Sequence, residues 1–162
     1  MRWIKHLFLY DLAVRRAFPR ATLGAIERSI AAQEKRHRGE LRFVVEGGLP
    51  LGPMLARRKA RDRAIEMFSR LRIWDTEDNA GVLIYLLLAD RRVEIVADRG
   101  IHAKVGAAAW DAICGEMQSA FATGRFEAGA ILGIEAISDL LTLHFPRNEE
   151  NPNELPDTPV VL

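Results

Sequence analysis

The chain has 162 residues and is 49% hydrophobic, which is enough to bury the core of one domain. Lysine and arginine total 23 against 22 aspartate and glutamate, so the formal net charge is only +1. Nucleic-acid-binding domains are usually strongly basic, and we therefore expect no nucleic-acid partner. Cys114 is the single cysteine, which excludes an internal disulfide and any need for an oxidising compartment.

Residues 1–19 form the first predicted segment. An apolar patch at 7–10 superficially resembles a signal peptide, but Asp11 interrupts it and no small-residue cleavage site follows. The pattern favours an amphipathic segment that docks on the domain, with contact to a membrane surface as the alternative.

The next two elements are a helix and a strand. Leu23, Ile26 and Ile30 recur at helical spacing, which predicts an amphipathic helix ending near residue 34. Residues 40–46 alternate between apolar and polar side chains, which predicts a half-exposed strand. Its predicted solvent face carries Glu40, Arg42 and Glu46.

A glycine-rich loop at 47–52 separates this strand from a helix predicted over 53–71. The dinucleotide-binding fingerprint needs G-x-G-x-x-G, whereas this loop reads G-G-x-x-x-G with a proline inside, so we predict a simple connection. Basic and acidic residues alternate along the helix, which predicts a solvated face rather than an anion site. The basic residues are Arg57, Arg58, Lys59, Arg61 and Arg63.

The apolar run Val82–Leu88 is too short to span a bilayer and predicts the central strand of a sheet, buried on both faces. Val93–Ala97 resumes the apolar pattern after a polar corner, which predicts an antiparallel hairpin partner. The helix between the strands at Glu40 and Gly81 predicts that these two are parallel. The fold class is therefore α/β, a three-layer α/β/α sandwich with a small mixed sheet.

The C-terminal half is predicted to be helical. Apolar positions over 105–121 and 126–144 follow helical spacing, with a corner between them. The rest is rich in proline and acidic residues, so we expect an extended tail whose apolar end, Val160–Leu162, docks. The predicted division is an N-terminal segment at 1–19, a domain at 20–145 and a tail at 146–162.

Most familiar catalytic patterns are missing from the sequence. Cys114 lacks the arginine of a phosphate loop and is predicted to be a core residue. The serines offer no G-x-S-x-G elbow. The histidines show no paired spacing of the kind that a zinc site needs. They are His6, His37, His102 and His144.

Topology nevertheless predicts a polar cluster at one edge of the sheet. The starts of the strands at Glu40 and Gly81 and the end of the strand at Ala97 share that edge. Carboxylate and amide oxygens there could bind Ca²⁺ or Mg²⁺, with an arginine facing a phosphate. Capping of strand ends and turn formation is the alternative. The predicted metal ligands are Asp75, Asp78 and Asp98, and the candidate catalytic residues are Asp78, Asn79, Asp98 and Arg99.

The same stretch carries a family likeness. The segments Asp78–Ile84, Ala89–Ile95 and Asp98–Ile101 resemble the TPM domain family, and the likeness extends over about 22–145. The family's corner is similar to G-[YF]-G, whereas this chain has Asp98-Arg99-Gly100, so the first glycine is replaced.

The resemblance implies an α/β/α sandwich and weak phosphatase activity, that is, hydrolysis of phosphomonoesters. It also implies an alternative, because other relatives resemble non-catalytic accessory factors that bind a membrane or multiprotein complex. Many bacterial members carry a signal peptide and a transmembrane tail. This sequence shows neither, so we expect a cytoplasmic protein, peripheral to the membrane if it meets one.

Overall fold

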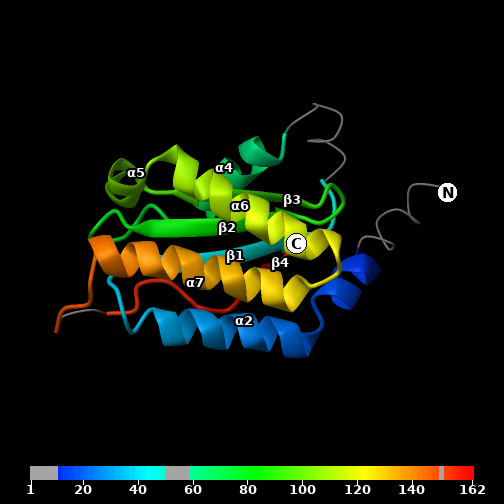
Figure 1. The fold of residues 1–162 in the computed structure, drawn as a ribbon, viewed down its shortest axis with the longest axis horizontal. Helices are drawn as coiled ribbons and strands as arrows, with labels where there is room; N and C mark the ends of the chain where they lie inside the picture. Colours follow the sequence, from blue (N-terminus) through cyan, green and yellow to red (C-terminus); the bar gives the residue numbers. More distant parts are fainter. Residues whose placement is uncertain (1–10, 50–58, 150–151) are drawn as a thin grey trace.

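A computed structural model describes residues 11–49, 59–149 and 152–162 (Figure 1). Within them a mixed four-stranded sheet has the order β3-β2-β1-β4. β1 is parallel to both β2 and β4, and β3 is antiparallel to β2. The predicted parallel pair and hairpin are therefore confirmed. The strands are β1 (Glu40–Glu46), β2 (Gly81–Leu87), β3 (Arg92–Ala97) and β4 (Val160–Val161).

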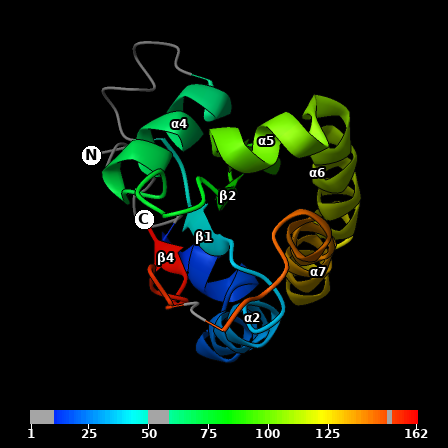
Figure 2. The same ribbon diagram turned by 90° about the vertical axis from the view of Figure 1, so that its left-hand side faces the viewer.

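Helices cover both faces of the sheet. One face packs against α2, α6 and α7, and the other packs against α4 (Figures 1 and 2). α5 leads from the end of β3 to α6. The three-layer sandwich predicted from the sequence is thus confirmed. The helices are α2 (Arg20–Gln33), α4 (Ala60–Arg70), α5 (Arg99–Val105), α6 (Ala107–Ala122) and α7 (Phe126–His144).

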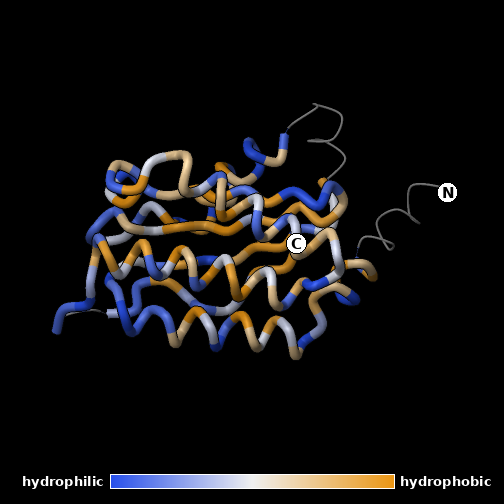
Figure 3. Tube along the Cα trace, viewed as in Figure 1, coloured by the Kyte–Doolittle hydropathy of each residue, from blue (hydrophilic) through white to orange (hydrophobic). Residues whose placement is uncertain are grey.

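β2 is the centre of the molecule, as the apolar run predicts. All seven of its residues are buried, and β1 and β3 flank it. Because side chains alternate along a strand, Ile84 enters the core beneath α2, α6 and α7, while its neighbour Tyr85 enters the core beneath α4. The hydrophobic colouring of the central strands in Figure 3 follows from burial on both faces.

The predicted solvent face of β1 is wrong, since all seven residues of this strand are buried. The polar residues Glu40, Arg42 and Glu46 are 2%, 6% and 2% exposed. α4 and the C-terminal tail cover this face. The pattern of residues within β1 does not predict this cover, because both segments are distant in the sequence. The predicted solvated face of α4 is wrong at Arg63 for the same reason, because that side chain turns inward and is 8% exposed.

The helical pattern beyond residue 100 is divided into two helices. Gly106 has a φ of 81°, so the chain turns there between α5 and α6 rather than continuing as one helix. Glycine adopts this left-handed region without the steric cost that a Cβ imposes. The helix expected from residue 53 begins at Ala60 within the described part of the chain, and residues 50–58 lie outside it.

Both ends of the described chain join the core. Val14 and Phe18 are each 2% exposed, and residues 11–17 are helical, whereas the apolar patch at 7–10 lies outside the described residues. Val160 and Val161 pair with β1, which confirms the predicted docking of the tail. The division at 19/20 and 145/146 stays a prediction. In the described ranges, no helix is both long and apolar enough to cross a membrane.

Candidate functional site

The predicted edge of the sheet is present at the end of the molecule where α5 lies (Figure 1). Glu40 is paired with Gly81, and Ala97 is paired with Val82, so the two strand starts and the strand end coincide. The Asp98 N–H donates to the Gly81 carbonyl at 2.9 Å. Pairing of β2 with β3 therefore places the turn before β2 beside the start of α5.

Gly100 explains how closely these two segments approach. A Cβ at this position would lie 2.6 Å from the carbonyl oxygens of both Asp78 and Asn79. Only a residue without a side chain fits so close to a backbone. Asp98, which replaces the first glycine of the family corner, has an ordinary φ of −67°, so the backbone needs no glycine there.

Asp98 is the most distinctive carboxylate of this edge. It is the N-cap of α5, where its Oδ1 accepts the Arg99 N–H at 2.7 Å. The side chain is 6% exposed, and Oδ2 is buried with no hydrogen-bond partner among the residues that the structure describes. A buried acceptor without a partner costs about 1–3 kcal/mol, so this oxygen suits a ligand that supplies positive charge.

The other predicted site residues have separate surroundings. Asp78 is part-buried and its Oδ1 lies 3.0 Å from Arg38 Nη1. Asp75 is exposed, with its Oδ2 2.6 Å from Arg72 Nη2 within the same turn. Asn79 and Arg99 are exposed, and Asn79 has a left-handed φ of 51°. The backbone of Asp78 and Asn79 thus meets the start of α5, whereas the Asp75 carboxylate pairs within its own turn.

No group of three or more histidine, cysteine, aspartate or glutamate side chains is arranged for a metal ion in ranges 11–49, 59–149 and 152–162. Sequence reasoning missed Arg38, the partner of Asp78. The signal that could have found it is its position directly before β1, since that strand begins at the same edge of the sheet.

Two glutamates, the buried Glu40 and the part-buried Glu34, lie near the contact between β1 and the tail. Glu40 accepts the N–H groups of Glu154 and Leu155 at 3.0 and 3.1 Å, yet burial raises its pKa from 4.5 to about 7. Glu34 accepts the Leu41 N–H at 2.9 Å. Burial, aided by Glu40 and by a hydrogen bond with Asp157, raises the pKa of Glu34 from 4.5 to about 9.

A second buried polar group lies beneath α4. Arg63 donates to both carboxylate oxygens of Glu46, each at 2.9 Å, and the Tyr85 hydroxyl donates to Glu46 at 2.5 Å. Arg63 also pairs with Glu66 at 3.0 Å. Burial together with the Glu46 charge raises the pKa of Tyr85. These groups satisfy one another, so the cluster joins α4 to the sheet.

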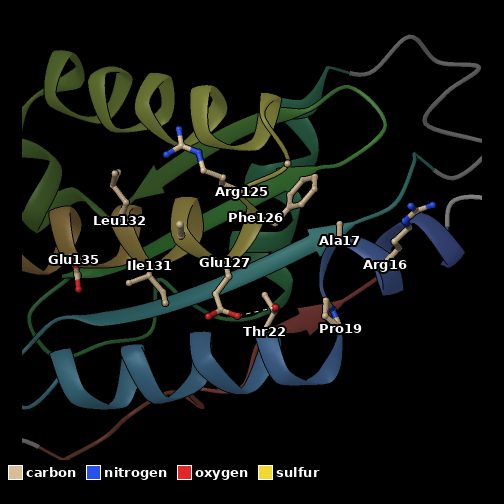
Figure 4. A pocket seen from close by; sticks show the side chains of 12 residues that line it. Arg16, Ala17, Pro19, Thr22, Arg125, Phe126, Glu127, Ile131, Leu132 and Glu135 are labelled. Atoms are coloured by element: carbon tan, nitrogen blue, oxygen red, sulfur yellow. Dashed lines mark hydrogen bonds between the residues drawn. The ribbon is translucent and has the colours of Figure 1, made fainter.

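An open cavity of about 810 Å³ lies at the opposite end, between α2 and the start of α7 (Figure 4). Arg16 and Arg125 flank it, and Ile131 and Leu132 supply apolar surface. Thr22 Oγ1 donates to Glu127 across the cavity at 2.9 Å. None of the predicted site residues lines it.

Fold and sequence together define the class of protein: a mixed-sheet α/β/α domain with a polar edge between β2 and α5. The sequence matches the family described as the TPM domain over residues 15–140. This chain belongs to the TPM domain family.

Two solved structures are similar to this chain. BA42 from the psychrophilic bacterium Bizionia argentinensis, an NMR structure, is 30% identical, with a TM-score of 0.77 over 88% of this chain and 93% of that one. The N-terminal domain of a P. gingivalis protein is 19% identical, with a TM-score of 0.58 over 75% and 76%. The latter likeness shows the fold alone. No curated protein matches the sequence.

Proposed function

We propose that this protein is a weak phosphomonoesterase assisted by Ca²⁺ or Mg²⁺, with its site at the edge between β2 and α5. The observation that carries the proposal is the buried Oδ2 of Asp98, which lacks a partner among the described residues. The carbonyl oxygens of Asp78 and Asn79 face Gly100, two residues along the chain from Asp98. Hard cations prefer such carboxylate and carbonyl oxygens. The matched family's designation as a TPM phosphatase points the same way.

In this proposal the acidic residues would bind the cation and the basic residue would bind the phosphate. Asp98 would hold the cation, and Asp78 and Asp75 could join it if their pairs with Arg38 and Arg72 opened. The exposed guanidinium of Arg99 would contact the phosphate, which it can bind through two parallel hydrogen bonds. Asn79 would orient the phosphate through its amide. A bound cation would supply charge stabilisation to the phosphoryl oxygens.

A phosphatase assay with p-nitrophenyl phosphate tests the proposal, run with Mg²⁺, with Ca²⁺ and with chelator. We expect chelator to abolish hydrolysis, and Asp98→Asn to lower kcat/KM by about 10–100-fold or more, the loss typical when a metal site loses even a supporting contact. Asparagine caps a helix as well as aspartate does, so α5 should stay intact.

Asp139→Asn is the matched control, because Asp139 is an exposed aspartate that pairs with Arg36 on the surface. It should leave hydrolysis unchanged. Hydrolysis that is equal in Asp98→Asn and in the control, or that persists at full rate with chelator, would rule out this site.

A non-catalytic interaction module is the second candidate, and the cavity beside α7 favours it. Its lining combines apolar side chains with two arginines and two glutamates, Arg16, Arg125, Glu127 and Glu135, which suits an amphipathic protein segment that carries charges of both signs (Figure 4). The apolar C-terminus, which such a module would otherwise use, is paired with β1. A cytoplasmic location, peripheral to the membrane if it meets one, stays a prediction under either function.

A further inference from the structure

The C-terminal segment, residues 152–162, lies along the outer edge of β1 like a bound peptide. Figure 2 shows β4 beside β1, on the side away from β2. The ladder between them is short, with Val160 opposite Val44 and Val161 opposite Val45. The Leu162 N–H then donates to the Val45 carbonyl at 2.9 Å. Without this segment β1 would be an edge strand with unpaired backbone groups.

Side chains of β1 form hydrogen bonds mainly with backbone groups of the C-terminal segment. The two carboxylate oxygens of Glu40 accept the consecutive N–H groups of Glu154 and Leu155, at 3.0 and 3.1 Å. The guanidinium of Arg42 donates to the carbonyl of Pro156, the residue that follows. Acceptors for adjacent N–H groups followed by a donor for a carbonyl are the features that recognise an extended peptide.

Two apolar anchors and one hydroxyl add sequence preference. Leu155 and Val160 pack against the core beneath α4, whereas Val161 is 43% exposed. Thr158 Oγ1 donates to Glu27 of α2 at 2.7 Å. This edge of β1 therefore fits an extended segment with leucine-proline followed by a part-buried valine at the fifth position after the leucine.

We propose that this edge of β1 is a peptide-binding site that takes residues 152–162 from a second copy of the chain as well as from its own. The segment that matches the carboxylates, the guanidinium and the two apolar contacts is this chain's own, and every copy carries it. Exchange between two copies would keep each of these contacts, and each copy would complete the sheet of the other.

The exchanged segment would also reach the polar edge. The carboxylate of Glu154 accepts the Glu77 N–H at 3.2 and 3.3 Å, in the turn that carries Asp75 and Asp78. In an exchanged dimer this contact to the turn would come from the second copy. The inference does not depend on phosphatase activity, because binding and exchange are measured without substrate.

The test uses the full-length chain, half labelled with ¹⁵N and half with ¹³C, unfolded together and refolded at low and high concentration. The segment of a copy's own chain is tethered to its β1, and a short flexible tether gives an effective concentration of about 1 mM. A second copy competes with it only near that concentration. We therefore expect dimers by light scattering near 1 mM and monomers far below it. Isotope-filtered spectra should show contacts between the amides of Val44 and Val45 in one copy and the methyl groups of Val160 in the other.

Val160→Asp should abolish the dimer because it places a charge against the core. Val161→Asp is the matched control and should dimerise as before, since that side chain is exposed. A chain that stays monomeric near 1 mM, or a dimer without these contacts between copies, would overturn the proposal. If refolding fails, warming the native labelled mixture to just below its melting temperature gives the same readout.

Discussion

Replacing Glu46 with glutamine is expected to lower the free energy of unfolding by about 3–5 kcal/mol, the largest effect of any single change considered for this protein. Arg63 is 6% exposed and donates to both oxygens of Glu46. Without the Glu46 charge, this buried guanidinium loses its main partner. Urea unfolding, followed by circular dichroism, measures the change.

Arg70→Ala is the control, because Arg70 also pairs with a glutamate of α4 but is 66% exposed. Exposed pairs contribute less than about 1 kcal/mol, so this variant should unfold at nearly the wild-type urea concentration. Glu46→Leu combined with Arg63→Met should recover much of the loss, since apolar residues can replace a buried ion pair. If Glu46→Gln and Arg70→Ala had equal midpoints, the buried pair would not join α4 to the sheet.

Stability is expected to fall as the pH rises from 7 to 9. The pKa of Glu34 is about 9 in the folded chain against its ordinary 4.5, so folding favours the protonated form. This contribution is complete below pH 4.5 and is lost as the pH rises toward 9, at about 1.4 kcal/mol per pH unit. Over two units the loss is about 2.7 kcal/mol, which lowers the melting temperature by about 5–10 °C.

Two other groups set the limits of that window. The pKa of Glu40 is about 7, so most of its contribution is lost by pH 7 and the remainder by about pH 8. Burial lowers the pKa of His37 from 6.5 to about 4, so its contribution is complete above pH 6.5 and disappears as the pH falls toward 4. The change in stability above about pH 8 therefore reports on Glu34 rather than on either of these groups.

Glu34→Gln identifies the group responsible. A neutral amide can accept the Leu41 N–H and donate to Asp157, as protonated Glu34 does. The melting temperature of this variant should therefore change little between pH 7 and 9. A wild-type chain whose melting temperature is equally flat would show that Glu34 is ionised throughout, contrary to the raised pKa of this carboxyl.

The sequence predicts the sheet well because its strongest signals are local. A continuous apolar run such as 82–88 is typical of a strand buried on both faces, and β2 is found there at Gly81–Leu87. The helix between two strands predicts their parallel pairing, which Glu40 opposite Gly81 confirms. These inferences need only neighbouring residues and the handedness of crossover connections.

The errors concern residues covered by distant parts of the chain. The alternation of β1 predicts a polar face in water, but the tail, more than a hundred residues further along, supplies the partners of Glu40 and Arg42. In the sequence, Arg63 is one of several basic residues of a predicted solvated face, yet in the structure it donates a hydrogen bond to Glu46 at the end of β1. A pattern of polarity cannot distinguish a solvated charge from one that a distant segment pairs and buries.

Part of the candidate site can also be predicted from the sequence. Strand pairing places Asp78 and Asp98 at one edge, because the start of β2 and the end of β3 must coincide. The pairing of Asp78 with Arg38 and the unpaired buried oxygen of Asp98 depend on side-chain packing. Sequence spacing does not encode those details.

Thermal unfolding with Ca²⁺, Mg²⁺ or chelator, on the wild type and on Asp98→Asn, tests the proposed site most directly. A cation at a hundredfold excess over its dissociation constant should stabilise the wild type by about 2.7 kcal/mol and raise its melting temperature by about 5–10 °C. Asp98→Asn should show no such rise. An unchanged wild-type midpoint under saturating cation, or an equal rise in Asp98→Asn, would contradict a metal-assisted site at Asp98.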